Sequence, residues 1–409
     1  MSRVERPRAV ASRGRATELA VFALLGGLTA FGPISHDMYL PALPQVAHGL
    51  RTSEAVVQAT LTASLVGLAL GQVLAGPVSD ALGRRRPLLC GLVAYIVAAA
   101  LCGLAPTAPI LVGLRVLQGA GGAAGVVIAR AIVRDRSHGA AAARSFSFLM
   151  LVSGLAPILA PVIGGQVLRV ADWRAVFALQ ALFGTVLLAG AWWLLEETLP
   201  PAARRRGGLG ATLAIVPALA RDPGFAGYVA SCALAFAAMF AYIAAAPFVF
   251  EQGFGLSPQG FSLLFATNAV GLTAASQVNG LLVGRVPAAR LLTVGLTATA
   301  GGGLGLALIG VHGHTGPLPA AAALFVTVSG LGFVLPNATA LALSTHPDRA
   351  GAAAALLGVT QYLAGAAVAP LAGLDPRHPL RSLAVAVAVP AVAALVARLA
   401  LARERRETA

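Results

Sequence analysis

One acidic and one basic side chain stand inside stretches of this sequence that otherwise hold apolar and small residues. Asp37 follows residues 19–35, which carry no charge, and Arg115 lies six residues after Pro109 in a second apolar stretch. A carboxylate placed in hydrocarbon costs about 2.5–3.5 kcal/mol on insertion scales, so each charge needs a partner or a cavity containing water. An acid that gains and loses a proton beside a guanidinium can couple proton movement to a second event.

Both charges are predicted to lie at the same depth in a membrane. If the two stretches are helices that run in opposite directions, a rise of 1.5 Å per residue places each charge about 6–10 Å inside the outer end of its helix. Asp37 and Arg115 would then form an ion pair or face each other across one cavity. The alternative is a structural tie between two helices. His36 is expected to be a local neighbour at the outer end rather than a proton relay.

The composition requires a membrane protein. Of the 409 residues, 58% are hydrophobic and only 11% are charged, whereas soluble domains carry about 25% charged residues. The net charge of +14 does not indicate nucleic-acid binding, because the arginines stand in short clusters between apolar stretches instead of forming one basic face. The elements that must position Asp37 and Arg115 are therefore membrane-spanning helices.

Twelve apolar stretches are long enough to cross a membrane as helices, which takes about 20 residues each. Their limits are charged residues, prolines and glycines, and the third and fourth stretches meet in the short segment 105–109. The predicted spans are residues 19–43, 54–79, 87–105, 109–131, 145–168, 173–195, 225–249, 259–284, 290–311, 318–343, 350–372 and 380–401. The predicted fold class is thus an all-α membrane protein.

The distribution of arginines predicts the orientation of the chain. An N-terminus inside the cell puts 23 arginines in cytoplasmic segments and five in outer loops, which assigns both termini to the cytoplasm. The predicted segments are a cytoplasmic tail at 1–18, a six-helix half at 19–195, a cytoplasmic linker at 196–224, a second six-helix half at 225–401 and a cytoplasmic tail at 402–409. A short interfacial helix is expected at 209–220. Two six-helix halves are the layout of a transporter that binds its substrate between them.

A charged loop with regular spacing joins the second and third spans. The segment 76–89 reads GPVSDALGRRRPLL, in which an acid ends the span, a glycine permits a left-handed turn and three arginines keep the loop inside. This loop resembles the signature of the major facilitator superfamily, whose fold is twelve helices in two pseudo-symmetric halves of six. The resemblance implies a cytoplasmic gate that engages the other half and holds the outward-open state. Its residues would be Gly76, Asp80, Gly83, Arg84 and Arg85.

Further motifs narrow the resemblance. The segment 114–124, LRVLQGAGGAA, is similar to the fourth-span motif of proton-coupled members, whose arginine corresponds to Arg115. The segment 154–165, GLAPILAPVIGG, resembles the fifth-span motif of drug antiporters, in which prolines and glycines let neighbouring helices rock; packing alone is the alternative. Its residues are Gly154, Pro157, Pro161, Gly164 and Gly165. The segment DMYLPALP, with ARAIVRD and FSLLFATNA further on, is similar to the bicyclomycin and chloramphenicol resistance (Bcr/CflA) group of drug:proton antiporters.

The resemblance implies drug:proton antiport by alternating access across the cytoplasmic (inner) membrane, driven by the proton gradient without a cofactor. Asp37 would bind and release the proton, and Arg115 would adjust the pKa of that carboxyl group. The drug would compete with the proton for the same cavity. Neutral polar and aromatic side chains are the lining expected for amphipathic compounds. The candidates are Met38, Tyr39, Gln58, Gln118, Tyr242, Phe248, Asn268, Asn337 and Gln361. For each of them, a hydrogen bond that packs two helices is the alternative.

Two other functions are compatible with the same features. A proton-coupled exporter of an endogenous metabolite or natural product would carry the same motifs, and a transporter-like sensor is a more remote alternative. The sequence has neither a glycine-rich phosphate-binding loop ending in Gly-Lys nor the His, Cys and Asp spacing of a metal site, so an enzyme or an ATP-driven pump is not predicted. The expected partners are a small-molecule substrate, protons and the lipid bilayer, with no nucleic acid, and the chain is expected to act as a monomer.

Overall fold

The computed structural model describes residues 15–136, 139–204, 217, 219, 221–312, 316–346, 350–373, 375 and 377–401. Most of the two predicted tails and of the interfacial helix expected at 209–220 lies outside these residues. We call α1 to α8 the first half: α1 (Arg15–Thr29), α2 (Phe31–His36), η1 (Leu40–Ala42), α3 (Leu43–Gly49), α4 (Glu54–Leu82), α5 (Arg85–Gly103), α6 (Ala108–Arg136), α7 (Gly139–Val167) and α8 (Trp173–Leu194).

The short turn η2 (Pro201–Ala203) follows the first half. The second half consists of α10 (Pro223–Pro247), the π-helical turn η3 (Phe248–Gly253), α11 (Pro258–Leu282), α12 (Ala288–His312), α13 (Pro317–Thr345), α14 (Ala350–Val368), η5 (Ala369–Gly373) and α15 (Pro379–Ala400). The one β-bridge among the described residues joins Val283 to Val286. The predicted all-α fold class is confirmed.

Within the described residues, nine helices are long and apolar enough to cross a membrane, and the bent pair Thr17–Thr29 with Phe31–Gly49 gives a tenth span. Two further helices, α7 and α14, contain shorter apolar stretches, Leu151–Val167 and Leu356–Ala372. A helix therefore occurs at each of the twelve predicted spans. The turn between α5 and α6 falls at residues 104–107, where the third and fourth spans were predicted to meet.

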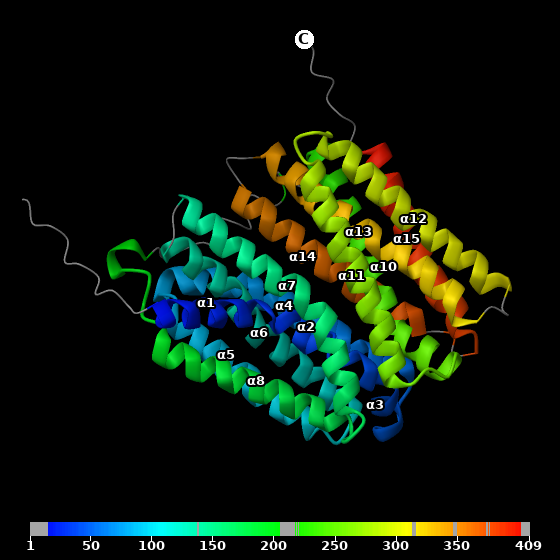
Figure 1. Ribbon diagram of the computed structural model, residues 1–409, viewed down its shortest axis with the longest axis horizontal. Helices are drawn as coiled ribbons and strands as arrows, with labels where there is room; N and C mark the ends of the chain where they lie inside the picture. The colour runs from blue at the N-terminus through cyan, green and yellow to red at the C-terminus, as the bar shows by residue number, and fades with distance from the viewer. Residues whose placement is uncertain are drawn as a thin grey trace, which may run out of the picture.

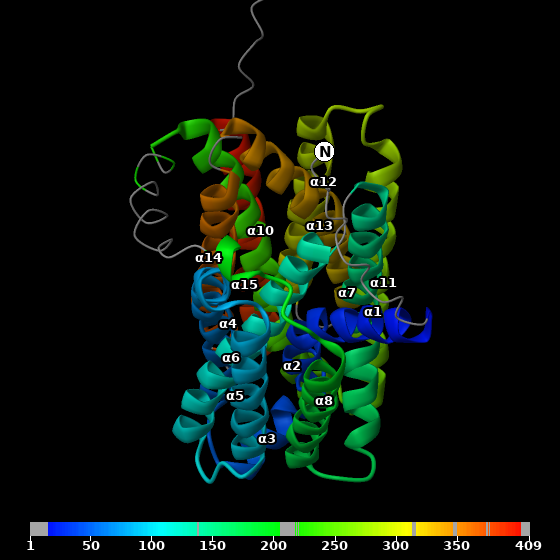
Figure 2. The same cartoon turned by 90° about the vertical axis from the view of Figure 1, so that its left-hand side faces the viewer.

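The first span is not the single helix predicted at 19–43. α1 ends at Thr29, and the segment that contains α2 and α3 is bent by 49° relative to it; Figure 2 shows α1 turned away from the direction of α5 and α8. Pro33 explains the break, because it has no N–H for the carbonyl of Thr29 and its ring clashes with that carbonyl. Asp37 consequently lies in a turn at the end of α2 rather than inside a long helix.

The two halves share a hydrophobic core at one end of the molecule. One buried cluster contains side chains of both halves, among them Tyr39 and Trp173 from the first half and Phe248 and Phe261 from the second. We call this end the α3 end, because α3 lies there (Figure 1). The opposite end, which holds the α4–α5 loop and residues 196–204, is called the linker end. There the described core divides into two clusters, each within one half.

Two pairs of helices connect the halves. α4 lies beside α14, and α7 lies beside α11, as Figure 1 also shows. In the first pair, the hydroxyl of Thr62 donates to the carbonyl of Ala366 at 3.2 Å. In the second pair, Nε2 of Gln259 donates to the carbonyl of Gly165 at 2.7 Å. These contacts, together with the shared core, pack the halves against each other at the α3 end.

Candidate functional site

A cavity of about 220 Å³ lies between the halves. The first half contributes residues of α2, α4 and α7 and the turn after α2, and the second half contributes residues of α10, α11, α13 and α14. Most of the wall is apolar or aromatic. The polar side chains in it are His36, Asp37, Tyr242, Asn268 and Tyr362. An apolar pocket with a few convergent polar groups is the usual form of a small-molecule site.

Asp37 is the one acid in the wall of this cavity. Its backbone is fixed on both sides, since its N–H donates to the carbonyl of Pro33 at 2.7 Å and its carbonyl accepts from the N–H of Leu40 at 3.3 Å. Its side chain is 8% exposed, and no hydrogen bond or ion pair joins the carboxylate to another described residue. The carboxylate is therefore free to take a proton or to contact a ligand in the cavity.

Arg115 is fully buried and is not part of the cavity wall. Its Nη1 donates to Oε1 of Gln118 at 2.6 Å, and its Nη2 donates to the carbonyl of Ser35 at 2.9 Å. Its guanidinium carbon lies 4.9 Å from the centre of the Tyr39 ring, a distance at which the cation is attracted to the ring face. Among the described residues, no ion pair within 4.0 Å joins Arg115 to Asp37.

The position of Arg115 follows from the broken first span. Because α2 ends at His36, its last carbonyls have no partners within the helix. Arg115 supplies a donor to Ser35, and Nε2 of Gln180 donates to the carbonyl of Ile34 at 2.9 Å. A cation at the C-terminus of a helix also complements the helix dipole. The predicted ion pair is thus replaced by a cap: Arg115 holds the segment that carries Asp37 and does not face the carboxylate.

Two of the residues predicted to line the substrate cavity lie in the wall of this cavity. Tyr242 and Asn268 line the cavity, and Nδ2 of Asn268 donates to the Tyr242 hydroxyl at 2.8 Å. The others lie outside its wall in this conformation: Met38, Tyr39, Gln58, Gln118, Phe248, Asn337 and Gln361. Asn337, for example, donates to Asn279 of the neighbouring helix. A polar residue in a span can be recognised from sequence, but the neighbour that it faces depends on helix packing.

His36 lies in the cavity wall next to Asp37, not at the outer end of a span as expected. Its Nδ1 donates to the carbonyl of Gly32 at 2.9 Å, while Nε2 is buried without a partner among the described residues. The aromatic rings of Phe236 and Phe240 on α10 also belong to the wall and were not predicted. Their only signal in the sequence is their aromatic type within a span of the second half.

The α4–α5 loop, expected to be a gate, is held within the first half. Gly83 ends α4 with a φ of +94°, which explains why glycine stands there. Arg84 is 3% exposed, because its guanidinium contacts Asp80 and binds Asp135 at 2.8 Å. Its backbone N–H donates to Glu197 at 2.8 Å. Within the described residues, the partners of this charged cluster all belong to the first half and to the start of the linker.

The glycines of α7 permit close contact with both halves. A Cβ atom on Gly164 would lie 2.1 Å from the carbonyl oxygen of Met38, and one on Gly165 would lie 2.5 Å from a side chain of α11. Gly154 has more room, since the nearest atom would lie 3.7 Å away. Pro157 lines the cavity, and Pro161 stands one turn further along the same helix. This motif therefore brings α7 against the segment that carries Asp37.

Comparisons of the whole chain agree with this architecture. The model of the Major Facilitator Superfamily matches residues 25–370. The chain is 37% identical over 360 residues to the MFS-type transporter YdgK of Bacillus subtilis (strain 168), covering 87% of this chain and 89% of that protein. It is 31% identical over 346 residues to the bicyclomycin resistance protein homolog of Haemophilus influenzae, covering 84% and 86% of the two chains.

A solved structure of low sequence identity has the same fold. The D-xylose-proton symporter superposes with a TM-score of 0.74 at 18% identity, covering 93% of this chain and 96% of that chain. Among the described residues, no group of three or more His, Cys, Asp and Glu side chains could hold a metal ion. The cavity between the halves, with Asp37 in its wall, is the candidate functional site.

Proposed function

Because this chain belongs to the Major Facilitator Superfamily, we propose that it exports small amphipathic drugs in exchange for protons across the cytoplasmic membrane. The similarity to a bicyclomycin resistance protein homolog supports a drug as the substrate. The halves at 19–195 and 225–401 would rock about the linker at 196–224, so that the cavity between them opens to one side at a time. The proton gradient is the energy source, and a single chain without a cofactor suffices.

The observation that carries this proposal is the unpaired carboxylate of Asp37 in a cavity made by both halves. An ionised acid in an apolar wall is costly unless a partner compensates its charge. A proton from outside or a polar group of the drug can each provide that compensation, but they compete for the same oxygen atoms. Competition of this kind couples proton uptake to drug release, because each ligand favours a different state of the site.

Arg115 acts in this scheme as a positioning residue. Its hydrogen bond to the Ser35 carbonyl fixes the backbone two residues before Asp37. Loss of that bond would leave the buried Ser35 carbonyl with only the longer contact from Nε2 of Gln180, at 3.5 Å, and would loosen the turn that presents the carboxylate. The guanidinium charge would still influence Asp37 across the short segment between them. The arginine of the fourth span therefore affects the proton site through the backbone of α2 as well as through its charge.

We assign the linker end to the cytoplasm, because the segments predicted to be cytoplasmic hold 23 arginines and the predicted outer loops hold five. The shared core then closes the outer side of the cavity, and the divided core leaves the halves apart on the cytoplasmic side. Pockets for drug-sized ligands measure about 300–1,000 Å³. The cavity of about 220 Å³ must therefore widen when such a compound enters from the inside.

The test is proton release by the purified protein when compounds are added. Bicyclomycin and chloramphenicol head the panel, and the unmodified chain is compared with Asp37→Asn in weakly buffered detergent solution. We expect drug addition to release protons from the unmodified chain but not from the variant. Asp172→Asn serves as the matched control, since Asp172 is a surface residue that caps α8 by accepting from the N–H of Arg174. Equal release by Asp37→Asn and the unmodified chain would contradict the proposal.

A further inference from the structure

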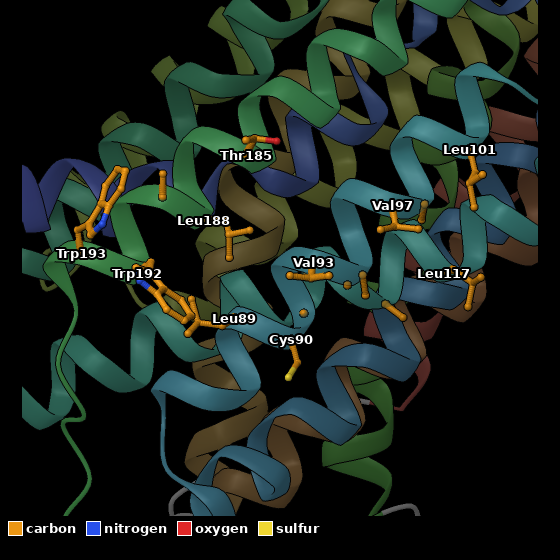
Figure 3. Close-up of a pocket in the computed structure, with 16 residues that line it drawn as sticks. Leu89, Cys90, Val93, Val97, Leu101, Leu117, Thr185, Leu188, Trp192 and Trp193 are labelled. Carbon is orange, nitrogen blue, oxygen red and sulfur yellow. The ribbon is translucent and has the colours of Figure 1, made fainter.

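An apolar groove lies on the outer face of the first half, away from the cavity between the halves. Its volume is about 1050 Å³, and it is formed by α5, α6 and α8 (Figure 3). Figure 3 shows Val93, Val97 and Leu101 along one side and Trp192 at one end of the groove. Thr185 is the one hydroxyl among the lining residues. The proposed transport mechanism makes no use of this groove.

The dimensions of the groove match one leaflet of a bilayer. Its lining on α5 runs from Leu89 to Leu101, and twelve residues of helix extend about 18 Å. The hydrocarbon core of a bilayer is about 30 Å thick, so one leaflet contributes about 15 Å. The lining includes the small residues Gly91, Ala94 and Gly121, and the two glycines let α5 and α6 pack closely. The groove is therefore long enough for the acyl chains of one lipid.

Arg85, at the start of α5, contacts Trp192 at the linker end of the groove, and Arg86 follows it in the chain. Arg85 lies one helical turn before Leu89; its Nη2 donates to the carbonyl of Trp192 at 2.8 Å, and its guanidinium carbon lies 5.4 Å from the centre of that ring. Nε of Arg85 is buried and has no hydrogen-bond partner among the described residues. Arg86 is exposed and forms no ion pair with a described residue. Tryptophan and arginine together are typical of the level of lipid headgroups.

We propose that this groove is a binding site for one anionic phospholipid, whose phosphate lies between Arg85 and Arg86 and whose acyl chains lie along α5. The charge of the rim selects the headgroup, because each arginine near the surface favours an anionic lipid over a neutral one. The apolar lining excludes a polar substrate. Since Arg85 begins α5 directly after Arg84, the lipid would lie beside the loop residue that binds Asp135 and Glu197.

Brominated lipids test the proposal directly, because bromine on an acyl chain quenches a tryptophan that it touches. Trp192 and Trp193 are 59% and 79% exposed at the groove, whereas Trp173 is buried at the α3 end and supplies a constant background. The purified full-length chain is titrated with brominated phosphatidylglycerol or brominated phosphatidylcholine in mixed micelles. We expect half-maximal quenching at an about tenfold lower fraction of phosphatidylglycerol.

Matched variants distinguish a specific lipid site from general electrostatic attraction between the protein and anionic lipids. Arg86→Gln, alone and together with Arg85→Gln, should raise the lipid fraction at which phosphatidylglycerol gives half-maximal quenching toward the value for phosphatidylcholine. The control is Arg285→Gln together with Arg290→Gln. It removes two exposed arginines of the second half and should not change the quenching. Ala94→Phe fills the groove and should lower the maximal quenching. Ala100→Phe adds the same ring to an exposed position of α5 outside the groove and should not.

Three outcomes would overturn the proposal. Identical curves for the two lipids would mean that the headgroup is not selected. An equal shift caused by the control pair Arg285→Gln and Arg290→Gln would mean that total surface charge, not the groove, attracts the lipid. A dimer on size exclusion whose tryptophans brominated lipid fails to quench would mean that a second copy covers the groove. None of these results bears on drug-induced proton release, so the proposed transport function is tested separately.

Discussion

Asp37 and Arg115 were expected to form an ion pair or to face each other across one cavity, but their surroundings differ. The carboxylate of Asp37 reaches a cavity and has no partner among the described residues. The guanidinium of Arg115 is fully buried, with hydrogen bonds to Gln118 and Ser35 and a ring beneath it. The Asp37 carboxylate is available to bind a proton or a ligand, whereas the Arg115 guanidinium holds helices together.

This difference indicates how a membrane protein can keep a titratable group without losing its fold. A buried charge with few partners is costly, so the backbone that carries such a group must be held by other hydrogen bonds. The carbonyls of Ile34 and Ser35 receive donors from Gln180 and Arg115. The turn that carries Asp37 is therefore rigid, although the carboxylate itself is free. Substitution of Asp37 should therefore mainly affect transport, and substitution of Arg115 should also lower the stability of the fold.

The largest effect is expected for Asp37→Asn on transport. The amide keeps the shape of the side chain but cannot bind and release a proton, so drug export driven by the proton gradient should fall by about 5–150-fold, the range of a coupling free energy of about 1–3 kcal/mol. The measurement is drug efflux from proteoliposomes with an imposed pH gradient. The thermal midpoint of unfolding in detergent should not fall. Efflux by Asp37→Asn within a factor of two of the unmodified chain would contradict the proposed difference between Asp37 and Arg115.

Arg115→Gln should lower the midpoint of thermal unfolding, which Asp37→Asn should not. The variant leaves the Ser35 carbonyl without its charged donor, and an unsatisfied buried group costs about 1–3 kcal/mol. We expect a lower midpoint of thermal unfolding than for Asp37→Asn. Arg290→Gln, at an exposed position of α12, is the control and should leave the midpoint unchanged. A variant Arg115→Gln as stable as the unmodified chain would mean that the cap on α2 does not stabilise the fold.

Substitutions in the glycine motif of α7 should have an intermediate effect, and they test whether close packing at the Asp37 turn is required. Gly164→Ala would place a Cβ atom 2.1 Å from the Met38 carbonyl oxygen, so the turn or α7 must shift. Gly154→Ala would meet its nearest atom at 3.7 Å, an ordinary contact. Efflux assays should show a loss of several-fold for the first substitution and little change for the second. Equal effects would indicate that close packing at the Asp37 turn is not required.

The smallest effect is expected at Glu197, a carboxylate whose surroundings contrast with those of Asp37. Glu197 accepts from the backbone N–H groups of Arg84, Arg85 and Leu199. Partial burial raises its pKa, but these donors and the nearby Arg204 lower it more, so that the pKa lies below its usual value. The stabilisation is therefore complete above the usual pKa of a glutamate and is lost as the pH falls through the lowered value.

Hydrogen exchange of the Arg84 and Arg85 amides measures this contact. Protection should persist from neutral pH down to the usual pKa of a glutamate and decrease only below it, whereas Glu197→Gln should reduce protection already at neutral pH. The change should be modest, because a partly exposed carboxylate is screened by solvent. Glu18→Gln, at an exposed position of α1, is the control. Unchanged protection in Glu197→Gln would show that the loop is held by Asp80 and Asp135 alone.

Much of the fold was determined by the sequence itself. The apolar stretches, the turn between the third and fourth spans and the motif at 76–89 predicted a twelve-span major facilitator fold, because hydrocarbon requires long apolar helices and leaves charge only at their ends. The match to the superfamily and the solved symporter confirm that fold. The unusual placement of Asp37 was also recognisable, since a lone acid in an apolar stretch is costly whatever surrounds it.

Only the tertiary structure decided which side chains meet. The bend at Pro33 turned Asp37 and His36 into the cavity, and the open C-terminus of α2 took Arg115 as its cap. Equal depth along two helices does not fix the rotation of either helix about its axis, and a rotation or a bend changes the partner of every polar group. The sequence therefore determines which residues are costly to bury, whereas packing determines which of them are satisfied and which remain free to act.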